Sequence, residues 1–202
     1  MAFFRLIPNL TIMAPKDFIE LQDMLEFVVN LNKPVSIRYP RGGEDEYKMA
    51  KHEKIELGKA EILKEGTDLT IIAIGKMVSK AMKIAEKLKK ENNLNIEVIN
   101  ARFLKPLDKK TIKKSILKTK NVITIEDGTI INGLATAIKE LIIDEKLKEI
   151  NIKSYAYPDE YIKHGTVDEL EDIYGLSIEK ITSYITNIKT LKQKKDKTRK
   201  GC

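Results

Sequence analysis

The sequence predicts an α/β fold with a mostly parallel sheet, and three observations support this. Short apolar segments alternate with amphipathic ones along most of the 202 residues, and the connections are short. The segments 69–75 (LTIIAIG) and 121–126 (NVITIE) are apolar and β-branched without alternation, which is typical of strands buried on both faces. The composition, 42% hydrophobic and 33% charged, is that of a globular chain and excludes global disorder.

The first elements form a strand, a helix and a second strand. Residues 10–14 read as a short apolar strand, which Pro15 ends. Asp17 is placed to accept hydrogen bonds from the first turn of a helix, with Glu20 at the capping-box position. Apolar residues then recur every three to four positions up to about residue 31. A strand at 35–38 follows, and the loop Tyr39–Gly43 comes after it.

A polar, charged stretch then separates two parts of the chain. We expect residues 1–45 to be the end of one α/β domain, 46–55 a linker, 56–191 a second α/β domain and 192–202 a disordered basic tail. In the second domain the pattern predicts strands at 58–66, at the sheet edge, and at 69–75, 96–100, 121–126 and 152–155. It predicts helices at 78–90, 107–117 capped by Asp108, 132–147, 166–174 with a Thr166/Glu169 capping box, and 178–191.

The charge distribution argues against nucleic acid as a partner. The net charge is +7, but residues 189–202 carry +6 of it, so the body is nearly neutral. We interpret the tail as a solvated segment, while RNA, DNA or an anionic membrane surface stays the alternative. No run of about 18 apolar residues predicts a membrane span, and the N-terminus does not resemble a signal peptide. The single cysteine, Cys202, excludes a disulfide framework and a Cys-based metal site, and fits a reducing cytoplasm.

The common catalytic motifs are absent from the sequence. There is no G-x-x-x-x-G-K-S/T phosphate loop, no G-x-S-x-G elbow and no G-x-G-x-x-G, although Gly75 stands where a dinucleotide fingerprint would begin. His52 and His164 have no partners at metal-ligand spacing. We interpret His52 as surface and His164 as structural or solvent-exposed rather than catalytic.

Two stretches have chemical character, and each has two interpretations. In Arg38-Tyr39-Pro40-Arg41-Gly42-Gly43 an arginine can bind a phosphate through its planar fork, or it can pair with a carboxylate. The loop follows a strand whose end should lie at the carboxyl edge of a sheet, where open α/β sheets place ligands. Glu126 and Asp127 end a buried strand, where they can serve as acid and base. Alternatively they form a turn in which both acids are exposed and favour the dipole of the following helix. We favour the turn, because no partner base is near in the sequence.

Taken together, several segments resemble one enzyme family, 1-deoxy-D-xylulose-5-phosphate synthase. They include Ile7-Pro8-Asn9, Met13-Ala14-Pro15-Lys16-Asp17 and Ile37-Arg38-Tyr39-Pro40-Arg41-Gly42 near the start. Further along they are Leu57-Gly58-Lys59-Ala60, Asn100-Ala101-Arg102-Phe103-Leu104-Lys105-Pro106-Leu107-Asp108, Tyr161-Ile162-Lys163-His164-Gly165 and Tyr174-Gly175-Leu176. The segments keep the family's order and spacing from about Phe4 to Ile185, and they resemble only its last third.

The resemblance implies a transketolase C-terminal-type domain, preceded by the end of a pyrimidine-binding domain. The family condenses pyruvate with glyceraldehyde 3-phosphate to 1-deoxy-D-xylulose 5-phosphate and carbon dioxide, with thiamine diphosphate and Mg²⁺, as a homodimer. Its cofactor-binding G-D-G segment and catalytic residues are missing here, so we expect them upstream of Met1. The resemblance therefore implies no catalytic, cofactor or metal residue in this chain and no activity for it alone. By the same resemblance, Arg41 corresponds to the arginine that binds the phosphate of the aldehyde substrate. The family's glycine-rich run is replaced here by Asn132-Gly133-Leu134-Ala135.

Two alternatives stay open at this point. The chain is also compatible with the C-terminal part of a transketolase or of a 2-oxo acid dehydrogenase β subunit. A non-catalytic dimerisation or binding module that uses the basic tail is the alternative from another class of protein.

Overall fold

The structure is a computed structural model, and it describes residues 1–40 and 54–187. Residues 41–53 and 188–202, which include Arg41, His52, most of the expected linker and the basic tail, lie outside the described residues. The strands are β1 (Thr11–Met13), β2 (Val35–Ile37), β3 (Glu61–Lys64), β4 (Leu69–Ala73), β5 (Ile96–Asn100), β6 (Phe103–Lys105), β7 (Asn121–Thr129) and β8 (Asn151–Tyr157). The α-helices are α1 (Phe18–Val29), α2 (Met77–Asn92), α3 (Lys109–Thr119), α4 (Leu134–Asp144), α5 (Val167–Ile173) and a last one at 178–187, and a short 3₁₀ helix spans Phe3–Leu6.

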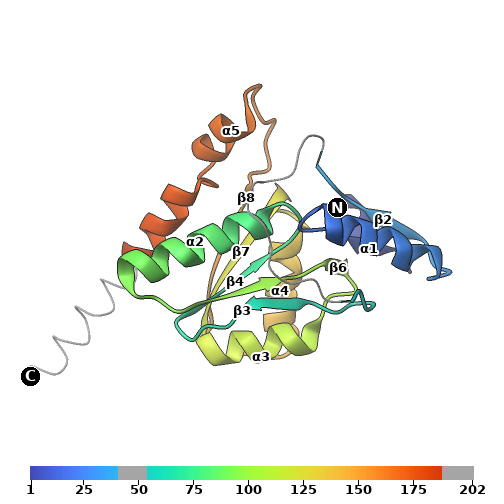
Figure 1. Cartoon of the computed structure of the whole chain (residues 1–202), viewed down its shortest axis with the longest axis horizontal. Helices are drawn as coiled ribbons and strands as arrows, with labels where there is room; N and C mark the ends of the chain where they lie inside the picture. Colours follow the sequence, from blue (N-terminus) through green and yellow to red (C-terminus); the bar gives the residue numbers. More distant parts are fainter. Residues whose placement is uncertain (41–53, 188–202) are drawn as a thin grey trace, which may run out of the picture.

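The main sheet has five strands in the order β3-β5-β4-β7-β8 (Figure 1). All neighbours are parallel except β3, which pairs antiparallel to β5 at the edge. The expected mostly parallel α/β sheet and its edge strand are thus confirmed. The chain passes from β4 to β5 on one side and then to β7 on the other, so the strand order reverses between β4 and β7. Open α/β sheets bind ligands outside the carboxyl ends of the strands at such a point.

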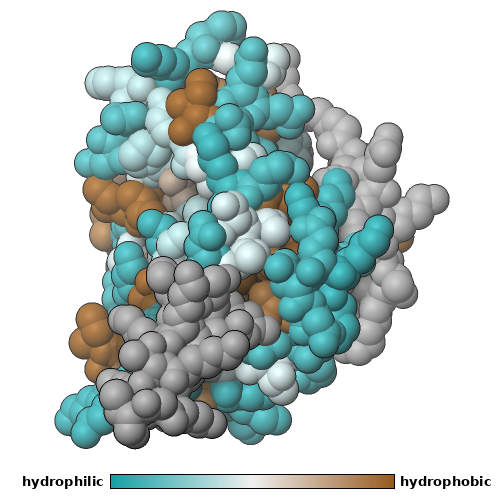
Figure 2. All heavy atoms as spheres, turned by 90° about the vertical axis from the view of Figure 1, so that its left-hand side faces the viewer, coloured by the Kyte–Doolittle hydropathy of each residue, from teal (hydrophilic) through white to brown (hydrophobic). Residues whose placement is uncertain are grey.

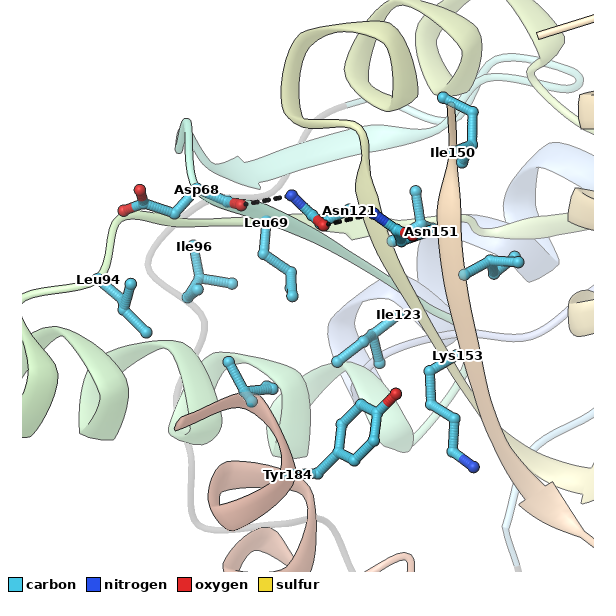
Figure 3. A pocket seen from close by; sticks show the side chains of 13 residues that line it. Asp68, Leu69, Leu94, Ile96, Asn121, Ile123, Ile150, Asn151, Lys153 and Tyr184 are labelled. Atoms are coloured by element: carbon cyan, nitrogen blue, oxygen red, sulfur yellow. Dashed lines mark hydrogen bonds between the residues drawn. The ribbon is translucent and has the colours of Figure 1, made fainter. Parts of the chain in front are cut away.

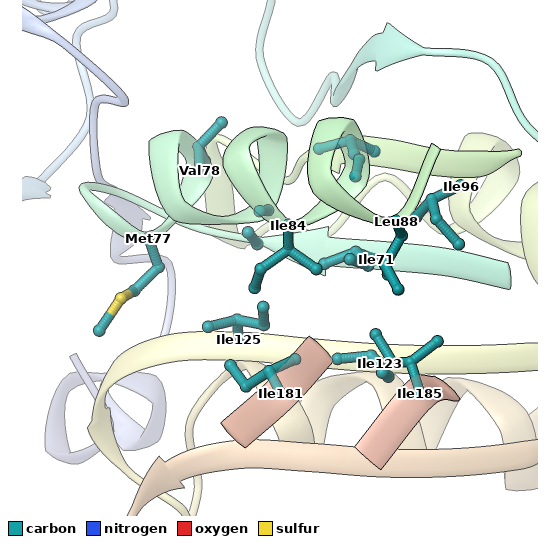
Figure 4. Packing of buried hydrophobic residues seen from close by; sticks show 14 of the residues in the cluster. Ile71, Met77, Val78, Ile84, Leu88, Ile96, Ile123, Ile125, Ile181 and Ile185 are labelled. Atoms are coloured by element: carbon teal, nitrogen blue, oxygen red, sulfur yellow. The ribbon is translucent and has the colours of Figure 1, made fainter. Parts of the chain in front are cut away.

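The sheet separates two hydrophobic cores, which explains why its strands show no alternation. On one face Ile71 of β4 packs with Ile123 of β7, beneath α2 and helix 178–187 (Figure 4). On the other face Ile72 packs beneath α3 and α4, in a cluster that also contains Ile12 of β1. Successive residues of β4 therefore point into opposite cores, and both must be apolar.

The segment 1–40 joins the rest of the chain through a second, three-stranded sheet. Its order is β2-β1-β6, with β1 parallel to β2 and antiparallel to β6. The sequence analysis did not predict β6, because its three residues lie inside a connection where they show no period of their own. A small cluster of Met13, Met24, Ile55 and Phe103 packs between this sheet and α1.

The capping residues that the sequence predicts at the helix N-termini are confirmed with one exception, Glu20. Asp108 caps α3, and Thr166 and Glu169 form the expected capping box of α5. At α1 the Asp17 side chain accepts the backbone N–H of Glu20, as expected. The Glu20 carboxylate, however, is buried and accepts the backbone N–H of Lys16, at 2.6 Å. It is held by a cluster of buried charges that the capping pattern does not reveal.

The side of the molecule that carries helix 178–187 is mostly hydrophilic. Figure 2 shows its hydrophobic side chains in small, separate patches. Among the described residues, no helix is both long and apolar enough to cross a membrane.

Candidate functional site

The carboxyl ends of β4 and β7, where the strand order reverses, carry opposite charges. Lys76 follows β4 at the start of α2, and Asp127 lies near the end of β7. The Lys76 Nζ atom lies 3.3 Å from Oδ2 of Asp127. Asp127 is only 18% exposed, so its charge is partly shielded from solvent.

Arg38 reaches the same carboxylate from the other sheet. It follows β2, its backbone N–H donates to the carbonyl of Met13, and its Nη2 atom lies 3.2 Å from Oδ2 of Asp127. One carboxylate oxygen is thus shared by Arg38 and Lys76. Of the two interpretations left open for this arginine, the structure shows the carboxylate pair. Arg41, the expected phosphate ligand, lies outside the described residues.

A row of ion pairs continues from Lys76 towards α5. The Nζ atom of Lys76 lies 3.8 Å from Oε1 of Glu171, and Lys80 pairs with the other carboxylate oxygen of Glu171. Lys80 also donates to the carbonyl of Leu176, at 3.0 Å. These ion pairs border a cleft of about 760 Å³ that lies between α1, α2 and α5. The walls of the cleft include Lys76, Lys80, Phe18, Tyr39, Asp168 and Glu171.

Tyr157 lies beside these charges at the end of β8. Burial, together with the charges of Asp127 and Glu171, raises its pKa to about 12. Its ring contacts that of Tyr174 edge-on, with 5.6 Å between centroids. The raised pKa keeps the phenol protonated at physiological pH, where its O–H group can donate a hydrogen bond.

Glu126, next to Asp127, caps a helix and does not form an acid–base pair with its neighbour. It is buried, and its two oxygens accept the backbone N–H groups of Leu134 and Ala135 at 2.8 and 2.9 Å. Burial raises the pKa of this carboxyl, and the two N–H donors oppose the rise. These contacts confirm one part of the turn interpretation, because the first turn of α4 binds the carboxylate. The expected exposed turn itself was wrong, since Glu126 is buried and both acids lie within β7, which continues to Thr129. A Cβ atom on Gly133 would lie 2.1 Å from Oε2 of Glu126, so this close approach needs glycine.

The remaining histidine of the sequence analysis is not part of this site. His164 is exposed in the connection between β8 and α5, as the structural or solvent-exposed interpretation expected. Across 1–40 and 54–187, no three His, Cys, Asp or Glu side chains gather so that they could hold a metal ion.

A buried cluster of charges joins the segment 1–40 to the main domain, and the sequence analysis missed it. Lys16 and Glu20 meet Glu61 and Arg102, and all four are at most 5% exposed. Lys16 Nζ lies 3.3 Å from Glu20 and 2.7 Å from Glu61. Arg102 binds Glu20 through Nε at 2.6 Å and Glu61 through Nη2 at 3.1 Å. Asn100 donates to both carboxylates. The cluster is neutral overall and holds α1 against the domain.

A second cavity, of about 590 Å³, lies at the opposite edge of the sheet (Figure 3). It opens at the amino ends of β4, β7 and β8 and is lined mainly by aliphatic side chains. The amides at its rim bind neighbours: Asn151 donates to Asn121 at 3.2 Å, and Asn121 donates to the Asp68 carbonyl at 3.4 Å. The cavity shares no lining residue with the cleft beside Lys76.

Comparison with known proteins identifies the domain and its relatives. Residues 58–181 match the family described as transketolase, C-terminal domain. The 1-deoxy-D-xylulose-5-phosphate synthase of Caldanaerobacter subterraneus subsp. tengcongensis is 42% identical over 184 residues, which are 91% of this chain and 29% of that protein. The synthase of Dictyoglomus turgidum is 43% identical over 94% of this chain and 31% of its own length. The matched part is the C-terminal region of these proteins.

Solved structures agree with this result. A structure described as a split gene transketolase, inactive beta4 tetramer, superposes with a TM-score of 0.83 at 27% identity, over 92% of this chain and 60% of that one. The transketolase of Campylobacter jejuni has a TM-score of 0.65 at 20% identity, over 27% of its length, and shows the fold alone. The expected transketolase-type C-terminal domain is therefore confirmed. The chain spans about 30% of the length of the curated relatives it matches.

Proposed function

Because the chain belongs to the family of transketolase C-terminal domains, we propose that it is the C-terminal part of a 1-deoxy-D-xylulose-5-phosphate synthase. The observation that supports this most strongly is the 42% identity to such a synthase over 91% of the chain. The complete enzyme would join pyruvate and glyceraldehyde 3-phosphate with loss of carbon dioxide. We propose that it works as a homodimer in the cytoplasm. The two curated relatives named above, which are more than 40% identical to this chain, are such synthases, whereas the two transketolase structures are 27% and 20% identical. This difference favours the synthase over a transketolase or a 2-oxo acid dehydrogenase.

The described residues offer no set of side chains that fits Mg²⁺, since no three His, Cys, Asp or Glu side chains gather among them. The first turn of α4, where an anionic group such as a diphosphate could bind, is already bound by the Glu126 carboxylate. We therefore derive no step through these groups and assign them to the upstream part of the synthase. The chain alone should then be inactive. The related split gene transketolase, described as inactive, is consistent with this proposal.

This chain's own contribution would be to bind the phosphate group of glyceraldehyde 3-phosphate. Arg41 follows three residues after Arg38, which Asp127 holds at the carboxyl end of β7. Three residues of chain span at most roughly 10 Å, which is compatible with the role that we propose for Arg41 at this edge of the sheet. A guanidinium there can bind a phosphate through two parallel hydrogen bonds. Lys76 and Asp127 would fix the start of the loop that carries it.

Arg41→Ala tests this role in a chimera, the Caldanaerobacter synthase with its matched C-terminal region replaced by this chain. A charged hydrogen-bonded contact contributes about 1.5–3 kcal/mol, so the KM for glyceraldehyde 3-phosphate should rise roughly 10- to 150-fold. Arg41→Lys should recover part of the loss, because a lysine lacks the planar fork. The pyruvate half-reaction, which involves no phosphate, is the internal control. Equal loss of pyruvate and aldehyde use would instead indicate a structural role for Arg41.

The binding-module alternative predicts a different result. If residues 192–202 bind nucleic acid, the affinity of the chain for RNA or DNA should fall steeply with salt and vanish when this tail is removed. We expect only weak binding, because the rest of the chain is nearly neutral.

A further inference from the structure

We propose that the cavity at the amino ends of β4, β7 and β8 binds an aliphatic carboxylate, with the hydrocarbon chain inside the cavity and the carboxylate on Lys153 at its rim. The cavity is separate from the edge of the sheet that we assign to the synthase reaction, and the inference does not rest on the proposed function. Its volume of about 590 Å³ lies within the range of about 300–1,000 Å³ that is usual for pockets that bind small molecules.

The walls of the cavity are aliphatic and come from several elements. Leu69 of β4 is in register with Ile96 of β5, and Ile123 of β7 and Ile185 of helix 178–187 complete this part of the lining. Leu94, Ile96, Ile123 and Ile185 are each at most 4% exposed, although they line a hollow. Apolar cavities of this kind bind apolar groups rather than water. A hydrocarbon chain is therefore the group that fits the interior.

Lys153 interrupts this apolar surface. It is in register with Ile123 and lies on the same face of β8 as Tyr155, which packs against the core on that side of the sheet. The Lys153 Nζ atom lies 5.6 Å from the ring centroid of Tyr184 and 5.8 Å from that of Tyr155. Within 1–40 and 54–187, no carboxylate forms an ion pair with it. The two rings thus hold a cation that is available to an anionic ligand.

The polar groups around the cavity fix the direction in which a ligand would lie. Figure 3 shows Lys153 and Tyr184 on one side of the cavity, and Asp68, Asn121 and Asn151 on the other. The two amides bind each other, and the Asp68 carboxylate repels an anion. An ammonium and a phenol both donate hydrogen bonds, so together they can bind one carboxylate. One lysine matches one negative charge, which favours a carboxylate over a phosphate or diphosphate ester.

The chain's own residues 188–202 are the alternative occupant. They follow Tyr184 and Ile185 closely in the sequence, and both of these residues line the cavity. We favour a small anion, because residues 189–202 carry a net charge of +6, which has the same sign as Lys153. Occupation by this segment is an outcome of the test.

The test measures the affinity of the full chain for octanoate and decanoate by calorimetry, below the concentrations at which they form micelles. We expect the affinity to rise roughly fourfold for each added methylene, and therefore roughly 15-fold from octanoate to decanoate. Methyl shifts of Ile123 and Ile185 in NMR spectra should locate the ligand in this cavity. Shifts confined to residues of the cleft beside Lys76 would contradict the proposal.

A matched pair of variants tests the carboxylate contact. Lys153→Met should weaken decanoate roughly fivefold or more and leave decanol, which has no charge, unchanged. Lys139→Met is the control, because Lys139 is exposed on α4 and does not line the cavity. It should bind decanoate like the unchanged chain. Leu69→Phe, which narrows the cavity, should weaken decanoate and decanol alike. Circular dichroism and urea midpoints check that each variant is folded.

Each outcome decides between the alternatives. Absence of binding, an affinity independent of chain length, or equal affinity of Lys153→Met and Lys139→Met for decanoate would overturn the proposal. If decanoate binds only after residues 188–202 are deleted, the chain's own segment is the occupant and the proposal is wrong.

Discussion

Removing the buried guanidinium of Arg102 should strongly destabilise the chain. Arg102 binds Glu20 and Glu61 at 2.6 and 3.1 Å, and its side chain is 2% exposed. Arg102→Met keeps the aliphatic volume and the Cβ atom, so the positive φ of 54° is no more strained than before. Two buried carboxylates would then share one cation, Lys16. Breaking a buried ion pair by removing one partner costs about 3–5 kcal/mol, because a charge is left uncompensated.

Urea unfolding of the chain measures this cost, with Lys113→Met as the control. Lys113 pairs with Glu145, and the two side chains are 41% and 37% exposed, so the loss of this pair should change the free energy of unfolding only slightly. A loss below about 1 kcal/mol for Arg102→Met would refute the reasoning that this cluster holds α1 against the domain.

Two further predictions concern the start of α4. Gly133→Ala should lower the free energy of unfolding by about 1–3 kcal/mol in urea titrations, since its Cβ would displace the Glu126 carboxylate; an unchanged midpoint would contradict this. Burial raises the pKa of Glu126 above its ordinary value of 4.5, so the folded state binds the carboxyl proton of Glu126 more tightly than the unfolded state does. The contribution of this side chain to the free energy of unfolding therefore falls as the pH rises from 4.5. The stability of the unchanged chain, relative to Glu126→Gln, should therefore decline over that range, and a constant or rising difference would count against it.

The sequence was sufficient for the main sheet because its signals are local. Runs such as 69–75 and 121–126 are apolar at every position, since both faces of the sheet are covered. The caps at Asp108 and Thr166 lie three residues from their partners and can be read directly. Strand β6 gave no such signal, because three residues are too short to show a period. Its pairing with β1 joins positions about ninety residues apart.

The site was only partly predictable for the same reason. The loop beginning at Arg38 was recognisable by its residue types, but its partner Asp127 lies 89 residues away, and only the fold shows that they meet. The buried cluster is a stronger example. Lys16, Glu20, Glu61 and Arg102 each look like a surface charge in the sequence, and Glu20 fitted a capping box. Their burial becomes visible only when α1, β3 and the end of β5 come together.

Product formation by the purified chain tests the central claim most directly. The chain is incubated with pyruvate, glyceraldehyde 3-phosphate, thiamine diphosphate and Mg²⁺, and 1-deoxy-D-xylulose 5-phosphate is measured. The same assay is repeated with a purified upstream fragment of the Caldanaerobacter synthase that ends where the matched 184 residues begin. If the chain is the C-terminal part of the synthase, it forms no product alone and forms product when the upstream fragment is added. Product from the chain alone, or none from the mixture although the two parts bind each other, would contradict the account.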